Sequence, residues 1–146
     1  MPVSTKSKAK GTAAEREVVR YLQNWWPAAE RRALSGNKDK GDVAGIPGVV
    51  VEVKAAATQQ LAGWFRETAA EQINAGAAFC MLVVKRAYKP VPQWDAWLPI
   101  GQLPVELRHF PAAGKGHIEW VRVDLFLAAQ LLHFQSQPSS STTASS

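Results

Sequence analysis

The feature of this sequence that most constrains its fold is a valine run interrupted by two opposite charges, Val49-Val50-Val51-Glu52-Val53-Lys54. Such a run predicts a buried β-strand. Because successive side chains of a strand point to opposite faces, Glu52 and Lys54 share one face with Val50, and the other valines share the opposite face. Charges inside an apolar strand are costly unless they are paired or hold a metal, so this face is a candidate site.

A second acidic residue precedes the strand. Asp42 lies in Gly41-Asp42-Val43-Ala44-Gly45 and completes the pattern Asp-x9-Glu-x-Lys. Two carboxylates suit a hard cation such as Mg²⁺, and an ammonium group beside them suits an attacked phosphate. The pattern therefore indicates a Mg²⁺-dependent phosphodiesterase. The alternative is an ordinary charged pair on the solvated face of an edge strand.

Residues 12–26 predict an amphipathic helix, ended by Pro27. Thr12 with Glu15 fits a capping box, which would give Glu15 a purely structural role. Glu15 also lies on the side of the helix that should pack on the sheet, together with Val18, Val19, Leu22 and Trp26. The helix alone leaves both roles open: a cap, or a third carboxylate of the site.

Four motifs in sequence order carry a resemblance to a known family. They are Lys10-Gly11-x3-Glu15-Arg16-Glu17, Arg32-x2-Ser35-Gly36, Asp42-Val43-x-Gly45 and Val51-Glu52-Val53-Lys54. In this order and spacing they resemble the archaeal-type Holliday junction resolvases, which belong to the PD-(D/E)xK nuclease superfamily. The resemblance covers residues 8–86, a little over half of the chain.

The resemblance implies a single-domain α/β fold of the restriction-endonuclease type, with a mixed central β-sheet flanked by helices. It implies that Glu15, Asp42, Glu52 and the Val53 carbonyl hold Mg²⁺, for which Mn²⁺ can substitute, and that Lys54 is the catalytic lysine. Its implied activity is a structure-specific DNA endonuclease that makes paired nicks in four-way junctions. Paired cuts imply a homodimer. A nuclease for a flap, a fork or a restriction site, and a non-cleaving DNA-binding module, remain the alternatives.

The resemblance also implies contacts with DNA. Arg16 and Arg32 are expected to contact phosphates or support the site, and Ser35 to touch the scissile strand. Arg31 and Arg32 are alternative candidates for the same role, a phosphate contact or support of the site. Further DNA contacts are expected from three lysines, namely Lys10, Lys38 and Lys40.

Two departures from the family pattern accompany these expectations. The proline that names the superfamily is Gly41 here, and we expect this difference to matter little, because the residue only shapes the approach to the strand. The loop between Gly36 and Asp42 is slightly longer than usual, which leaves the role of Ser35 open.

Charge and cysteine content agree with a nucleic-acid enzyme of the cytoplasm. The net charge of +5 over 146 residues favours an anionic partner, although charge alone fits RNA or a membrane surface equally well. The lone Cys80 lies in an apolar run and has no partner for an internal disulfide, so we expect a reducing cytoplasm. No apolar run approaches the length of a membrane span, and no signal peptide is recognised.

The sequence predicts one domain with two flexible ends. Residues 1–10 form a basic, flexible N-terminal segment, residues 11–134 the nuclease domain, and residues 135–146 a disordered Ser/Thr-rich tail. Within the domain we expect these elements: a strand at 30–35, a hairpin of the Asp42 and Glu52 strands, a helix at 58–75 capped by Thr58 and closed by Gly76, strands at 79–86, 94–98 and 117–123, and a last helix from Asp124 to Phe134.

Two helices carry specific expectations. In the second helix, Leu61, Trp64, Phe65, Ala69 and Ile73 repeat at helical spacing and predict the face that packs on the sheet. The last helix is apolar on more than one side. We expect it, through residues such as Phe126 and Leu132, to form a two-fold interface; packing across the end of the sheet is the alternative.

Overall fold

The computed structural model describes residues 5–33, 40–104 and 119–137. Its elements, in chain order, are α1 (Thr5–Leu22), β1 (Glu30–Arg31), β2 (Val43–Ala44), β3 (Val49–Lys54), α2 (Leu61–Ala75), β4 (Phe79–Val84), the short 3₁₀ helix η1 (Val91–Gln93), β5 (Asp95–Pro99), a second 3₁₀ helix η2 (Ile100–Gln102), β6 (Trp120–Asp124) and α3 (Leu125–Ser136).

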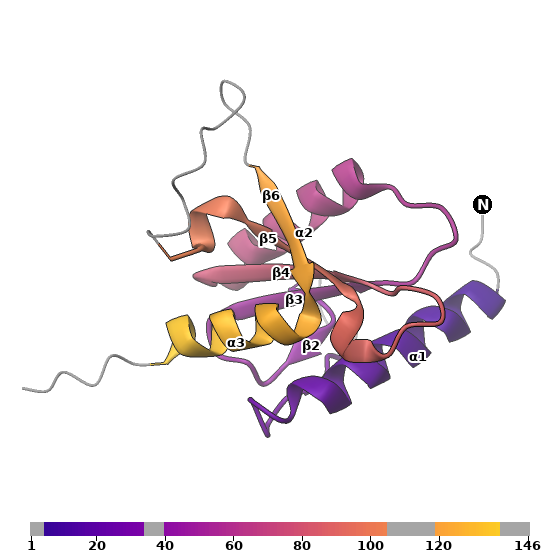
Figure 1. The fold of residues 1–146 in the computed structure, drawn as a ribbon, viewed down its shortest axis with the longest axis horizontal. Helices are drawn as coiled ribbons and strands as arrows, with labels where there is room; N and C mark the ends of the chain where they lie inside the picture. The colour runs from indigo at the N-terminus through magenta and orange to yellow at the C-terminus, as the bar shows by residue number, and fades with distance from the viewer. Residues whose placement is uncertain (1–4, 34–39, 105–118, 138–146) are drawn as a thin grey trace, which may run out of the picture.

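A mixed sheet organises the described residues, with strand order β3-β4-β5-β6 (Figure 1). The strands β3 and β4 are parallel and are connected through α2, whereas β4–β5 and β5–β6 are antiparallel pairs. The strands β1 and β2 form a separate antiparallel ribbon. The predicted α/β class, with a mixed sheet flanked by helices, is confirmed at this level.

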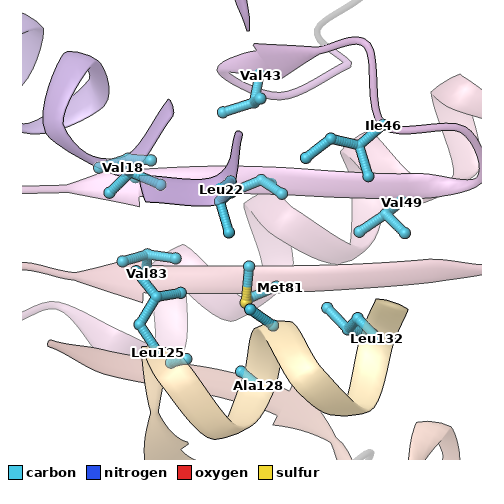
Figure 2. Packing of buried hydrophobic residues seen from close by; sticks show 14 of the residues in the cluster. Val18, Leu22, Val43, Ile46, Val49, Met81, Val83, Leu125, Ala128 and Leu132 are labelled. Carbon is cyan, nitrogen blue, oxygen red and sulfur yellow. The ribbon is translucent and has the colours of Figure 1, made fainter. Parts of the chain in front are cut away.

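The two faces of the sheet differ in what covers them. On one face α1 and α3 pack together, and Val18 and Leu22 of α1 meet the same core as Met81 of β4 and Leu125 of α3 (Figure 2). On the opposite face, α2 places Trp64 against β4. The valines Val49, Val51 and Val53 belong to the first core, so Glu52 and Lys54 face α2, as the alternation predicted.

The first helix begins earlier than predicted. It starts at Thr5, so residues 5–10 are helical rather than flexible, and Thr12 lies inside the helix. Lysine and alanine in this segment are good helix formers, and the single Gly11 costs about 1 kcal/mol, too little to stop them. The capping-box role of Glu15 is therefore excluded. The predicted packing side is correct, since Val18 and Leu22 are fully buried.

The predicted hairpin between the Asp42 and Glu52 strands is wrong. The strand β2 pairs with β1, with Glu30 opposite Ala44, and not with β3. At Gly45 the chain passes so close to Ala28 that an added Cβ would lie 2.0 Å from the Ala28 carbonyl oxygen. This close approach holds β2 beside the segment that enters β1.

The second helix is shorter at its start than predicted. It begins at Leu61 after Gln60, not at Thr58, and it ends as expected at Gly76, which adopts a left-handed conformation (φ 60°). Its buried side chains are Trp64, Thr68 and Glu71. The predicted apolar stripe fails at its end, where Ile73 is 80% exposed. The stripe becomes polar because the sheet face beneath it carries Glu52 and Lys54.

The C-terminal elements follow the prediction more closely. Asp124 caps α3 by accepting a hydrogen bond of 2.8 Å from the Leu127 amide. Leu132, expected at a dimer interface, is instead fully buried in the core, whereas Phe126 is 49% exposed. The alternating apolar positions of α3 thus split between core and surface. Within the described ranges, no helix combines the length and apolar character needed to cross a membrane.

Candidate active site

Asp42 is fixed against the outer edge of β3 by its backbone and its side chain. The Asp42 amide donates to the Val51 carbonyl oxygen at 2.9 Å, and the Val53 amide donates to Asp42 Oδ2 at 2.8 Å. The N–H and C=O of one strand residue point to the same edge, so the Val53 carbonyl also faces the Asp42 side.

Gly41 matters more for this arrangement than expected. Its φ is +92°, and a Cβ there would lie 2.9 Å from the Val51 carbonyl oxygen. Proline is held near −65° and cannot adopt this conformation. Glycine is therefore required for the chain to approach β3 in this way, and the expectation that the residue type matters little is wrong for this chain.

Glu52 and Lys54 project from β3 into the space under α2. Glu52 is 4% exposed, and Lys54 Nζ lies 3.3 Å from its Oε1. The Asp42 and Glu52 side chains are also within hydrogen-bonding reach of each other. The three residues of the Asp-x9-Glu-x-Lys pattern are thus neighbours in space.

Helix α2 adds two acidic residues that the sequence reasoning missed, Glu67 and Glu71. Lys54 Nζ donates to Glu67 Oε1 at 3.1 Å. Carboxylate oxygens of Glu52, Glu67 and Glu71 all lie within 4.8 Å of one another. A signal was present in the sequence: Glu71 stands seven residues after Trp64 and Glu67 four before Glu71, which places both near the packed stripe. Because both residues are acidic, a pattern defined by apolar residues does not include them.

Two carboxyl groups of the site, those of Asp42 and Glu52, have raised pKa values. Burial, and then the charge of Glu52, raise the pKa of Asp42 to about 8, against the lowering effect of the Val53 amide. Burial, and then a hydrogen bond with the Glu71 side chain, raise the pKa of Glu52 to about 9. Near neutral pH these groups therefore hold protons in the absence of a cation.

Lys54 keeps its charge. Burial by itself would lower its pKa, but the carboxylates of Glu52 and Glu67 together outweigh burial, and the pKa of Lys54 is raised. Its ammonium is therefore a permanent positive charge held between two acids, and it is not a proton acceptor at neutral pH.

Glu15 stands at the edge of the cluster. Its carboxylate pairs with Arg31, whose Nη2 lies 2.9 Å from Glu15 Oε2. Its charge also contributes to raising the pKa of Asp42, so the two residues are neighbours. Glu15 is nevertheless not part of the group of carboxylates that lie within 4.8 Å of one another. Its influence on the site is electrostatic in this structure.

The expected DNA-contacting residues are spread around the cluster. Arg31 is engaged with Glu15, whereas Arg32 and Lys40 line a pocket of about 280 Å³ beside the start of β3, so Arg32 is the better candidate of the two arginines. Arg16 is exposed on α1. Lys10 is exposed and lines a second pocket. Ser35 and Lys38 lie outside the described residues, as does the loop residue Asp39.

The donor set fits a hard divalent cation. Glu52 Oε2 receives no hydrogen bond from an amide, hydroxyl or ammonium group of the described residues, and the carboxyl groups that reach the Glu52 side chain are those of Glu71 and Asp42. Within the group formed by Glu52, Glu67 and Glu71, the Lys54 ammonium pairs with Glu52 and Glu67, and Asp42 lies beside Glu52. Several carboxylate oxygens with excess negative charge are the ligands that Mg²⁺ and Mn²⁺ prefer.

Comparisons with protein-family models, with curated proteins and with solved structures found no match to this chain. Function is therefore inferred from the residues and from their geometry.

Proposed function

We propose that this protein is a metal-dependent DNA endonuclease with a restriction-endonuclease-like core, acting as a Holliday junction resolvase. The observation that carries the proposal is the convergence of Asp42, Glu52 and Lys54, in which a buried acid, Glu52, and a half-buried one, Asp42, both with raised pKa, stand beside an ammonium that stays charged. A stable core does not need two neighbouring carboxyl groups withdrawn from water. Binding a cation and then a phosphate gives them a role.

The metal would be held by Asp42 and Glu52, with the Val53 carbonyl on the same edge and Glu71 on the α2 side of Glu52. When bound, Mg²⁺ or Mn²⁺ supplies Lewis acidity and a water of lowered pKa. Asp42 and Glu52 must lose their protons to act as ligands, so metal binding is coupled to proton release.

Lys54 would contribute charge to the reaction. Its ammonium, held by Glu52 Oε1 and Glu67 Oε1, provides a fixed hydrogen-bond donor for a phosphate oxygen as negative charge grows in the transition state. Glu67 is 41% exposed at its side chain, so it can turn away to free Lys54 when a phosphate arrives. Glu15 would tune the site through its charge on Asp42.

The substrate assignment rests on charge and on the family resemblance. A net charge of +5, together with Lys10, Arg32 and Lys40 around an acidic centre, suits a polyanion. The preference for four-way junctions, and the homodimer that paired nicking requires, come from the resemblance of the four sequence motifs to archaeal-type resolvases.

The proposal is tested by incubating the protein with labelled DNA of several forms in Mg²⁺ and mapping the cuts. A four-way junction, a replication fork, a flap and a linear duplex of the same sequences form the panel. The expected result is paired nicks placed symmetrically across the junction. Cuts confined to the fork, flap or duplex would assign another substrate, and binding without any cut would indicate a non-cleaving module.

A further inference from the structure

A pocket of about 340 Å³ opens where the parallel strands β3 and β4 end. It is lined by Lys10 of α1, by the alanines 55–57 that follow β3, and by Lys85 and Ala87 that follow β4. The lining residues comprise two lysines and four alanines, with no carboxylate among them. The pocket is therefore positive, although the acidic cluster lies only a few residues away along β3.

The Lys85 backbone lies beside that of Lys54 at the end of the sheet, whereas the Lys85 side chain turns to the face covered by α1, opposite the face from which Glu52 and Lys54 project. Its amide donates to the Lys54 carbonyl oxygen at 2.9 Å, which continues the pairing of β3 with β4 beyond Val84. Its ammonium lies 5.5 Å from the centre of the Trp94 ring, a cation–π contact that favours one side-chain position. The pocket thus begins directly after Lys54 and has one cation that is already oriented.

The alanines determine what can enter. Side chains of this size leave room for a group as bulky as a sugar-phosphate unit to approach the backbone, while the two lysines supply charge without a planar hydrogen-bonding pattern. Lysine acts on a phosphate as a point charge, so such a pocket recognises the charge of a phosphate group and does not distinguish base sequences.

We infer that the pocket between Lys10 and Lys85 binds a phosphodiester group of the nucleic-acid strand that passes Lys54. This inference rests on the proposed function and extends it, because it gives the strand a path out of the site along the carboxyl ends of β3 and β4. The pocket holds the backbone at a phosphate beside the scissile one and fixes the register of the strand.

The test measures DNA binding by the full chain without a divalent cation, so that no cleavage is required. Anisotropy of a labelled four-way junction is recorded from about 50 to 200 mM salt. Each of Lys10→Gln and Lys85→Gln is expected to lower affinity about eightfold at 0.1 M salt and to reduce the slope of log K against log salt by about 0.9, the value for one lost phosphate contact. The matched control is Lys89→Gln, an exposed lysine that does not line the pocket.

A second pair of variants tests whether DNA binding needs the open volume of the pocket, without changing the charge of the protein. Ala56→Phe fills the pocket and should weaken DNA binding with an unchanged salt slope, whereas Ala70→Phe on the exposed side of α2 should have no effect. The inference is overturned if Lys10→Gln, Lys85→Gln and Ala56→Phe all bind DNA as their controls do.

Titration with inorganic phosphate distinguishes a pocket that binds a nucleic-acid strand from one that binds a small anion. If ³¹P line broadening reports phosphate binding that Lys85→Gln abolishes while DNA affinity stays unchanged, the pocket is a site for a free phosphate compound and the inference fails. If the protein cuts no DNA but the pocket variants still weaken DNA binding, the pocket stands and the nuclease proposal falls. If the protein cuts DNA but its pocket variants bind DNA normally, the nuclease proposal stands and the inference about the pocket fails.

Discussion

At the residue scale, the chemistry of the site is governed by the shortage of positive charge among its carboxylates. Glu52 is almost fully buried, touches one ammonium through Oε1, and shares its remaining surroundings with the acids Asp42 and Glu71. A protein that only had to be stable would not place acids in this way. Protons relieve the repulsion in the metal-free protein, and under the proposed function a bound divalent cation would relieve it instead.

This arrangement predicts how stability depends on pH. Between the ordinary pKa of Glu52, 4.5, and its folded value of about 9, the folded protein holds a proton that the unfolded chain has released. The free energy of unfolding therefore falls as pH rises through this window, by about 1.4 kcal/mol per pH unit for a fully shifted group, and levels off above it. The pKa of Asp42 is also raised, to about 8, and because the charge of Glu52 contributes to that rise, the two groups lose their protons as a coupled pair in the same direction of pH.

Thermal unfolding in a chelator from pH 5 to pH 9 measures the effect. The melting temperature of the wild type should fall relative to that of Glu52→Gln, which imitates the protonated acid and cannot titrate. Addition of Mg²⁺ should restore the most stability at the alkaline end. Parallel curves for the two proteins would show that Glu52 titrates normally.

At the scale of elements, the approach of residues 41–42 to β3 positions the first carboxylate. The Asp42 amide donates a hydrogen bond to the Val51 carbonyl oxygen, and the Asp42 carboxylate accepts one from the Val53 amide, so both bonds fix Asp42 against the edge of β3. Gly41 is the residue that permits this approach, through a positive φ and the absence of a Cβ.

Gly41→Ala should therefore reduce stability and displace Asp42. The added Cβ would meet Val51 O at 2.9 Å in a backbone conformation that already disfavours alanine, and we expect a loss of about 2–4 kcal/mol in urea unfolding. Gly48→Ala is the matched control, since its φ is also positive (+74°) but nothing lies within 4 Å of the added Cβ; it should cost only about 1 kcal/mol. Equal losses would show that the close approach at Gly41 is not important.

Some features of the elements could be predicted from the sequence. Alternation in the valine run placed Glu52 and Lys54 on one face correctly, because a period of two is a local property of any strand. The capping residue Asp124 and the terminator Gly76 were also local signals and were confirmed. The pairing of β2 with β1 depends on contacts between distant segments that no local pattern encodes. For Glu67 and Glu71, helical spacing from Trp64 indicates the packed side of α2, but their approach to Glu52 depends on how α2 packs on β3.

At the scale of the whole molecule, α3 divides its apolar residues between two environments. Leu125, Ala128, Ala129 and Leu132 are fully buried against the sheet, whereas Phe126, Leu127 and Phe134 are exposed. Phe126 meets Trp25, in the turn that follows α1, edge to face at 6.2 Å, so the exposed residues continue onto the segment after α1. We propose that a second copy of the chain covers this surface, as paired nicking requires.

Light scattering tests the dimer. The wild type should show about twice the chain mass, and Phe126→Glu or Phe134→Glu should yield folded monomers that nick junctions without paired cuts. Leu132→Glu is not suitable, because burying a charge in the core should unfold the protein by several kcal/mol. A monodisperse wild-type monomer that still cuts junctions symmetrically would contradict the proposed dimer.

The measurement that tests the central claim most directly is single-turnover cleavage of a labelled four-way junction in Mg²⁺ by the wild type and by Asp42→Asn, Glu52→Gln and Lys54→Ala. The wild type should cut, and each variant should lose cleavage by about 10² or more while still binding the junction, because each removes a metal ligand or the transition-state charge but leaves the basic surface intact. Cleavage by any of the three at the wild-type rate, or a folded wild type that binds the junction and Mn²⁺ but never cuts, would contradict the assignment of this site.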